Sequence, residues 1–311
     1  MLTQTITDPR AWTAATIDDP SYWYCPLPQA CVSAFTEVRS SFQWTPRPKI
    51  VLPEASRAAC AQALAPVRDV LENGRGFVII ESPPLEPRDA VLLYWIVGHG
   101  LGLPFAQNVD GVMLYDVRDA GQDLTKGARF SVTNYESSFH TDNSFGDDIL
   151  DYVGLLCLHV AKAGGRSQIV SGCAAHNALL KEYPQELATL YEAFHVDRRG
   201  GVRGGESPTV RFPIFHADAK DLVVRYLRYW IEAGHEKAGQ PLTPAQVNAF
   251  NVLDGVLNRR ELRVEFDLKP GDMYFINNRW TLHNRTAFED HADAARRRHL
   301  VRLWLQKTLA T

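Results

Sequence analysis

The chain has 311 residues, and its 33 Lys and Arg against 36 Asp and Glu leave a formal net charge of −3. Apolar residues make up 45% and charged residues 22%, which are ordinary values for a soluble globular protein. This balance supplies no basic excess, so we expect neither a nucleic-acid-binding protein nor one that binds anionic membranes.

The first fifty residues differ in composition from the rest of the chain. Residues 1–50 are rich in Pro, Thr and Ser with scattered aromatic side chains, which predicts an irregular N-terminal arm packed onto the other residues. Amphipathic spacing then predicts a helix over 54–71. A short buried strand is expected over 76–80, and Asp89 can cap a second helix over 90–98.

After residue 139 the pattern becomes mostly that of strands. Strands are expected over 149–160, 167–170, 262–268, 273–276, 282–288 and 299–306. Helical spacing covers 174–194, and Thr243 can cap another helix that has Pro244 in its first turn. These elements predict a mainly β fold with α-helices, in which residues 51–311 form one domain with a helical insertion at about 195–260 between core strands.

Targeting and cysteine patterns indicate a cytoplasmic protein. The first residues lack a basic stretch followed by an apolar one, and no run reaches the ~18–20 apolar residues of a membrane helix. The cysteines are odd in number and irregularly spaced, which predicts neither a disulfide framework nor a zinc site. They are expected to be free, mostly buried thiols: Cys25, Cys31, Cys60, Cys157 and Cys173.

A candidate metal site begins at Ser138-Phe139-His140-Thr141-Asp142. On a strand, a spacing of two directs His140 and Asp142 to the same face, whereas in a helix they would be about 200° apart. His283, in a late strand, can supply a third ligand. Two histidines and one carboxylate leave half of an octahedron open, the arrangement of non-haem Fe(II) oxygenases. An H-x-D triplet is common by chance, so neighbouring residues must support this reading.

The last strand provides that support. Strand parity places Arg298, Arg302 and Trp304 on one face. A buried guanidinium requires an anionic partner, and its planar fork suits a carboxylate. A 2-oxo diacid could therefore bridge the metal and one of these arginines.

Together these motifs resemble the taurine/2,4-D dioxygenase-like (TauD/TfdA) family of Fe(II)/2-oxoglutarate-dependent oxygenases. The resemblance covers residues 76–306 and is weakest over the first fifty. His140-Thr141-Asp142 matches the H-x-D/E motif and His283 the distal histidine. Gly164-Gly165-Arg166-Ser167 matches a Gly-Gly-x-Thr/Ser turn, and the run 277–288 is also typical of the family. The resemblance implies a double-stranded β-helix (jelly-roll, cupin-like) core with flanking helices.

The same resemblance implies roles for individual residues. His140, Asp142 and His283 would hold Fe(II), and Ser167 would contact the oxoacid end of 2-oxoglutarate. Arg302 matches the arginine that binds the distal carboxylate of this co-substrate, and Arg298 matches a second arginine often found with it. The long interval 289–297 leaves open which of the two arginines is the main anchor. The implied reaction uses O2, releases succinate and CO2, and hydroxylates an unactivated C–H bond of a small metabolite.

Substrate contacts are harder to predict. Asn134 and Glu136 would face the cavity if the strand that carries His140 were regular, and Asn143 and Phe145 could close over it. Residues of this kind are more often simply loop or edge residues. The Gly-rich segment with Arg198, Arg199 and Arg203 could form a lid over an anionic substrate, although such runs are usually solvated loops.

Several alternatives stay open at this stage. A non-catalytic jelly-roll binding or sensor protein would keep the same pocket, and an oxygenase of this family could perform desaturation or ring closure. A zinc hydrolase is a weaker alternative, because Arg298 and Arg302 would then lack a partner. The expected partner is a small-molecule substrate whose identity the sequence does not give, with neither nucleic acid nor membrane involved. Assembly into homo-oligomers stays open.

Overall fold

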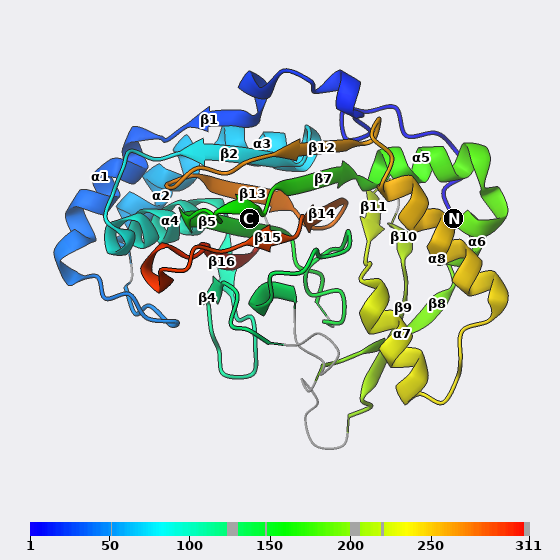
Figure 1. The fold of residues 1–311 in the computed structure, drawn as a ribbon. Coiled ribbons are helices and arrows are strands. Elements are labelled where there is room, and N and C mark those ends of the chain that lie inside the picture. The colour runs from blue at the N-terminus through cyan, green and yellow to red at the C-terminus, as the bar shows by residue number, and fades with distance from the viewer. Residues whose placement is uncertain (51, 123–129, 147, 200–205, 219–220, 308–311) are drawn as a thin grey trace.

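The computed structural model describes residues 1–50, 52–122, 130–146, 148–199, 206–218 and 221–307 (Figure 1). It has a mixed α and β fold built around one large sheet. The strand order in this sheet is β1-β2-β13-β5-β16-β3, and β4 also pairs with β16. The seven strands are β1 (Tyr24–Pro26), β2 (Phe77–Glu81), β3 (Leu103–Phe105), β4 (Leu114–Val117), β5 (Tyr152–His159), β13 (Met273–Asn277) and β16 (His299–Gln306).

A smaller sheet carries further cavity-lining residues on its strands β7 and β14. Its order is β12-β7-β14, with antiparallel pairing throughout. These strands are β7 (Ser167–Ser171), β12 (Arg263–Phe266) and β14 (Thr281–Arg285). Three two-stranded pairs complete the β structure: β6 (Ala163–Gly164) with β15 (Phe288–Glu289), β8 (Ala193–Asp197) with β9 (Thr209–Pro213), and β10 (Phe215–Asp218) with β11 (Asp221–Val224).

Two groups of helices pack at opposite sides of the sheets in Figure 1. The N-terminal group contains α1 (Gln29–Val38), α2 (Glu54–Ala63), α3 (Ala65–Asn73) and α4 (Pro87–Leu101). The second group contains α5 (Gly172–Glu182), α6 (Pro184–Leu190), α7 (Arg228–Lys237) and α8 (Pro244–Leu257). The predicted start of α8 is confirmed, because the Thr243 and Gln246 side chains form a reciprocal capping box there.

The N-terminal arm is more regular than predicted. It contains α1, and its strand β1 pairs in parallel with β2 at the edge of the large sheet. Cys31 and Phe42 are buried in the same core cluster as residues of α4. Local composition could not reveal this order, because the strand is defined by pairing with residues about fifty positions away in the sequence.

Two predicted helices are divided. The helix expected over 54–71 is interrupted at Leu64, after which α3 begins with Pro66 in its first turn. The one expected over 174–194 ends before Pro184, continues as α6, and gives way to β8. The segment expected as a helical insertion at 195–260 contains α7 and α8 but also strands β9 to β11.

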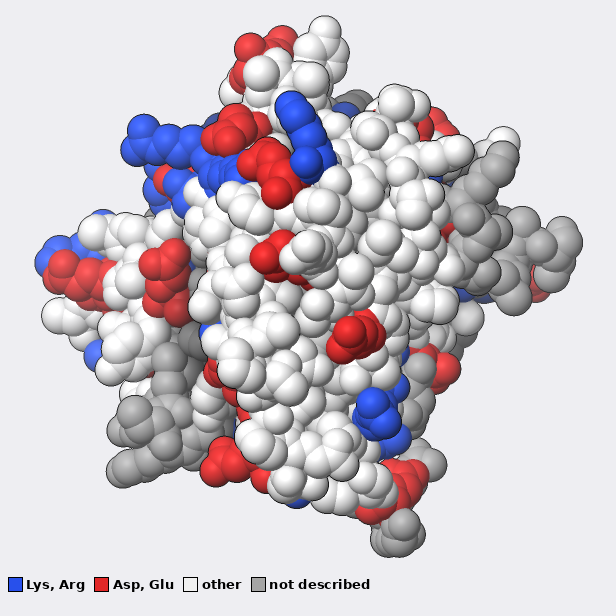
Figure 2. All heavy atoms as spheres, turned by 90° about the vertical axis from the view of Figure 1, so that its right-hand side faces the viewer, with Lys and Arg blue, Asp and Glu red and all other residues white. Residues whose placement is uncertain are grey.

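Charged side chains are sparse over the centre of the face drawn in Figure 2. Of the helices in the described residues, none is both long and apolar enough to cross a membrane. The five cysteines are free, as predicted, and four of them are buried.

Candidate metal centre and co-substrate pocket

A cavity of about 130 Å³ opens between the two sheets and the segment that carries the H-x-D motif. Its walls come from β5, β7, β14, β16 and α7, together with residues 137–145. The residues that line it are Val117, Ser131, Ser137, His140, Thr141, Asp142, Asn143, Ser144, Phe145, Leu155, Ser167, Leu227, Trp230, Tyr274, His283, Asn284, Arg285, Arg298, Leu300, Arg302 and Trp304.

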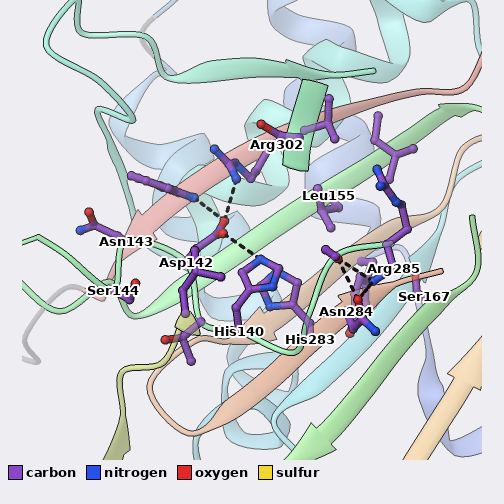
Figure 3. A pocket seen from close by; sticks show the side chains of 18 of the residues that line it. His140, Asp142, Asn143, Ser144, Leu155, Ser167, His283, Asn284, Arg285 and Arg302 are labelled. Atoms are coloured by element: carbon purple, nitrogen blue, oxygen red, sulfur yellow. Dashed lines mark hydrogen bonds and ion pairs between the residues drawn. The ribbon is translucent and has the colours of Figure 1, made fainter. Parts of the chain in front are cut away.

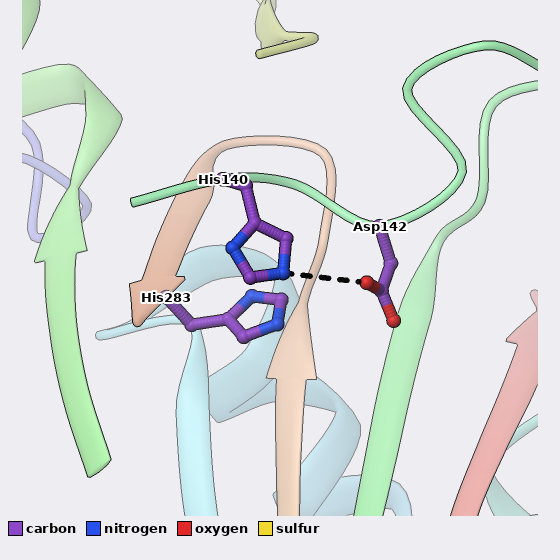
Figure 4. A group of neighbouring side chains, drawn as sticks. All are labelled: His140, Asp142 and His283. Carbon is purple, nitrogen blue, oxygen red and sulfur yellow. Dashed lines mark ion pairs between the residues drawn. The ribbon is translucent and has the colours of Figure 1, made fainter. Parts of the chain in front are cut away.

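His140, Asp142 and His283 converge in this cavity (Figure 4), each offering one ligand atom, with all three atoms within 4.8 Å of one another. The motif does not lie in a regular strand, contrary to the prediction. Instead His140 forms an isolated bridge with His283, in which each backbone N–H donates to the other's carbonyl at 3.0 Å. The bridge brings the two rings to 4.3 Å between centroids.

Asn278 holds the backbone of Asp142. Its Oδ1 accepts the Asp142 N–H at 2.7 Å, and its Nδ2 donates to the Asp142 carbonyl at 2.9 Å. Thr141 is tied in a similar way, since its N–H donates to the carbonyl of Tyr226 at 2.9 Å. Sequence analysis did not single out Asn278. The available signal was a buried amide directly after the apolar strand β13, five positions before His283.

The His140 ring is oriented by its own backbone. Nδ1 lies 2.8 Å from the carbonyl oxygen of Ser138. A carbonyl can only accept, so Nδ1 carries the proton in this hydrogen bond. Nε2 is the ring nitrogen that faces Asp142, 3.6 Å from its Oδ1. A carbonyl acting on the far ring nitrogen is the usual way in which a metal-binding histidine is fixed.

Asp142 is held at one of its two oxygens (Figure 3). Oδ2 accepts a hydrogen bond from Trp304 Nε1 at 2.9 Å and forms an ion pair with Arg302 Nη1 at 3.0 Å. Burial alone would raise the pKa of Asp142, but the Arg302 charge and the hydrogen bond with His140 hold that pKa well below its usual range. The carboxylate is thus charged, and Oδ1 is the oxygen directed toward His140.

His283 is partly buried, and its ring makes no hydrogen bond to any described residue, although its Nδ1 is itself buried. Burial, together with the neighbouring His140, lowers its pKa to about 3. The imidazole is therefore neutral at physiological pH, and the neutral form is the one that binds metals. Two imidazoles and one ionised carboxylate fit a divalent cation of the Fe(II) type.

Arg302 supports this cluster through two of its guanidinium nitrogens. Besides its ion pair with Asp142, its Nε donates to Gln107 Oε1 at 2.8 Å. Gln107 in turn donates from Nε2 to the Arg302 carbonyl at 2.9 Å. The guanidinium also lies over the rings of Tyr115 and Trp304, 5.2 Å and 4.9 Å from their centroids.

Arg298 is in a different situation. It is only 6% exposed, and its Nη1 is buried with no hydrogen-bond partner. Burial lowers the pKa of Arg298 to about 10, with Cys157 and Asp290 acting in the opposite direction. Gly165 makes room for it, since a Cβ there would lie 3.2 Å from Arg298 Nε, and Gly165 has a φ of +73°. The Arg298 guanidinium thus lines the cavity and forms no ion pair with a carboxylate of the described residues.

The other predicted contacts divide into two groups. Ser167, Asn143 and Phe145 line the cavity, but Asn134 and Glu136 do not, which corrects that prediction. The strand parity behind it fails because 133–139 is irregular, and Ser137 faces inward instead. The parity within 298–304 is correct, because Arg298, Arg302 and Trp304 all line the cavity.

The lid prediction is answered only in part. Arg199 stacks on Trp230 at 3.7 Å, and Arg198 forms an ion pair with Glu206 at 3.9 Å, while Arg203 lies outside the described residues. Trp230 and Leu227 line the cavity and were not predicted. They come from α7 and the residue before it, a region whose sequence carries no polar motif.

The fold and site define a 2-oxoglutarate-dependent non-haem iron dioxygenase, which uses Fe(II), 2-oxoglutarate and O2. The chain belongs to the taurine catabolism dioxygenase TauD, TfdA family, whose model matches residues 37–304. FR-33289 synthase of Streptomyces rubellomurinus is 29% identical over 319 residues, covering 98% of this chain and 91% of that protein. L-asparagine oxygenase of Streptomyces coelicolor is 26% identical over 227 residues, covering 70% of this chain and 60% of that protein.

Solved structures share the fold. One is asparagine oxygenase with Fe(II), 3-hydroxyasparagine and succinate, which has a TM-score of 0.67 at 18% identity and covers 92% of this chain and 94% of that one. Another is the non-haem iron oxygenase OrfP with Fe and α-ketoglutaric acid, with the same TM-score, identity and coverage.

Proposed function

We propose that His140, Asp142 and His283 hold the iron, and that the enzyme hydroxylates a C–H bond of a small polar metabolite while 2-oxoglutarate is converted to succinate and CO2. The observation that carries this proposal is the convergence of the three ligand atoms within 4.8 Å, with the His283 ring otherwise unengaged. When bound, Fe(II) and 2-oxoglutarate supply the oxidising chemistry with O2. The protein contributes ligand orientation and the position of the target carbon.

Arg298, rather than Arg302, is the main anchor for the distal carboxylate of 2-oxoglutarate in this proposal. Arg302 already has Asp142 as its anionic partner and Gln107 as a second acceptor. Arg298 has a buried, unpaired N–H, and leaving a buried cation without an anion is unfavourable. Ser167 lines the same cavity as Arg298. In this proposal Ser167 contacts the distal end of the co-substrate together with Arg298, rather than the oxoacid end.

The substrate side of the cavity combines apolar and polar groups. Phe145, Leu227 and Trp230 provide an apolar wall. Ser144 is 3% exposed, and its hydroxyl oxygen is buried without a partner, which favours a substrate that brings a hydrogen-bonding group. Two structural neighbours are complexes with 3-hydroxyasparagine and (3S)-hydroxy-L-Arg, and we propose a metabolite of similar size and polarity, in contact with Asn143 and Phe145.

The two sheets and the domain bounds are also part of this proposal. We propose that the large sheet and the β12-β7-β14 sheet are the two faces of a double-stranded β-helix, within a single domain over 51–311. The TM-score of 0.67 to asparagine oxygenase supports this arrangement. Cytoplasmic location and the absence of nucleic-acid and membrane partners stay predictions, and homo-oligomers stay open.

The test is succinate formation by the purified protein with Fe(II), O2 and 2-oxoglutarate, while fractions of a metabolite pool are screened for compounds that increase the rate. Asp142→Ala is expected to abolish turnover. Asp89→Ala is the matched control, because Asp89 is also a buried carboxylate paired with arginines but lies outside the cavity. Turnover that survives in Asp142→Ala would contradict the assignment of the ligands.

A further inference from the structure

Arg298, which is buried, and Arg285, which is partly buried, both line the cavity and place their guanidinium groups against the ring of Phe288. The guanidinium carbon of Arg285 is 4.7 Å from the centroid of Phe288, and that of Arg298 is 5.1 Å from it. Neither guanidinium forms an ion pair with a carboxylate among the described residues. Two like charges packed against one ring and partly removed from water are unfavourable unless an anion joins them.

The charge balance of the lining supports the same conclusion. Its charged side chains are Asp142 and the three arginines Arg285, Arg298 and Arg302. Arg302 is already paired with Asp142, so two positive charges are left without a counter-charge in the lining. Asp290 lies close by, but its Oδ1 accepts the Arg298 backbone N–H and its Oδ2 is buried without a partner.

Each of the two arginines has one buried nitrogen without a hydrogen-bond partner among the described residues. Arg285 donates from Nη1 to the Thr133 carbonyl at 3.2 Å and from Nη2 to the Tyr135 carbonyl, but its Nε is buried without a partner. The unused donor of Arg298 is Nη1. A carboxylate has two oxygens that can accept several hydrogen bonds, so one carboxylate can satisfy both donors.

The position of Arg285 on β14 fits a co-substrate that starts at the metal ligands. His283 and Arg285 are two residues apart on this strand and share a face, about 6.6 Å apart along the backbone. Arg285 is also paired in register with Ser167 of β7. A five-carbon keto diacid with its keto acid end at the metal ligands would extend its second carboxylate along this face.

We infer that Arg285 is a second binding residue for the distal carboxylate of 2-oxoglutarate, which is held between the guanidinium groups of Arg285 and Arg298. The inference rests on the proposed function, which assigns Arg298 as the main anchor of this carboxylate, with Ser167 as a further contact. It makes Arg285 a determinant of co-substrate choice, because a keto acid without a distal carboxylate gains nothing from the pair.

The test compares two keto acids by titration calorimetry on the Mn(II)-loaded protein. One is 2-oxoglutarate, and the other is 2-oxopentanoate, which has the same keto acid end but a methyl group in place of the distal carboxylate. The variants are Arg285→Gln and Arg285→Lys. Arg68→Gln is the matched control, because the Arg68 guanidinium also binds two backbone carbonyls, those of Gly100 and Ala61, but lies outside the cavity.

Arg285→Gln is expected to weaken 2-oxoglutarate binding about tenfold, as one lost charge-assisted hydrogen bond would, and to change 2-oxopentanoate binding by less than about twofold. Arg68→Gln should change neither. Equal weakening of both keto acids would overturn the inference, since Arg285 would then act only by holding Thr133 and Tyr135. A wild-type protein that binds neither compound would instead refute the proposed function.

Arg285→Lys protects the test against a Gln variant that fails to fold. Lysine keeps the charge but has no planar fork, so the preference for 2-oxoglutarate over 2-oxopentanoate should fall below that of the wild type. A Lys variant with the wild-type preference and an unchanged melting temperature would overturn the inference.

Discussion

The indole N–H of Trp304 offers a sensitive probe of the metal centre, because it acts on a ligand without being one. It donates to Oδ2 of Asp142 at 2.9 Å, and the only other donor to this oxygen in the described residues is Arg302. Trp304→Phe removes this donor and keeps an aromatic ring in the buried position. Oδ2 of Asp142 then keeps only Arg302 as a partner among the described residues, and the carboxylate is less firmly oriented.

The magnitude follows from the type of bond that is lost. A hydrogen bond to a charged group contributes about 1.5–3 kcal/mol, and loss of a group that orients a metal ligand typically weakens metal binding about 10–100-fold. These two ranges agree, because tenfold corresponds to about 1.4 kcal/mol. We therefore expect Mn(II) affinity to fall between about 10- and 100-fold.

The assay is Mn(II) titration calorimetry of the metal-free protein, with a melting curve to check folding. Trp12→Phe is the matched control, because the Trp12 indole donates to the Arg75 carbonyl at 2.7 Å far from the ligands in sequence and outside the cavity. Unchanged Mn(II) affinity in Trp304→Phe, or an equal loss in Trp12→Phe, would refute the reasoning.

Three further predictions test neighbouring parts of the site. Gly165→Ala should raise the KM for 2-oxoglutarate in steady-state kinetics, because the added Cβ would displace Arg298. Gly239 also has a positive φ but has open space around it, so Gly239→Ala should lower the melting temperature and leave the KM unchanged. Asn278→Ala leaves the backbone of Asp142 without both of its hydrogen bonds and should lower the unfolding free energy by about 2–4 kcal/mol in urea titrations; a loss below about 0.5 kcal/mol would contradict the role of this amide. In the metal-free protein, the His283 pKa of about 3 lies below the unfolded value of about 6.5. Between these pH values the unfolded state binds more protons than the folded state, so the free energy of unfolding should fall as the pH drops from 6.5 toward 3. This group contributes at most about 1.4 kcal/mol per pH unit to that fall. His283→Gln should reduce that slope in urea midpoints measured at pH 7 and pH 5, although His99 and His176, with pKa values of about 4, retain their share of it.

The sequence singled out the three residues that we propose as ligands because their chemistry is specific and their order in the chain is informative. His140, Asp142 and His283 do converge, although by a backbone bridge and a turn rather than by a strand. The same assumption of a regular strand predicted that Asn134 and Glu136 face the cavity, whereas Ser137 lines it instead. Periodicity gives correct directions only where the secondary structure is regular.

The choice between Arg298 and Arg302 could not be made from the sequence. Both have the same parity on the last strand, and both face the cavity. They differ in their partners: Arg302 binds Asp142 and Gln107, which lie about 160 and 195 positions away in the chain. The arm over 1–50 was misjudged for a related reason, because β1 exists only through its pairing with β2.

The bridge between His140 and His283 has a consequence for how metal loading affects the protein. Two ligands are fixed by backbone hydrogen bonds, and the third by the amide of Asn278, and none of these contacts involves a metal. The three side chains therefore lose little conformational entropy when an ion binds, and they stay ordered when it leaves. Iron starvation should leave a folded, inactive enzyme that regains activity as soon as the ion returns, without refolding.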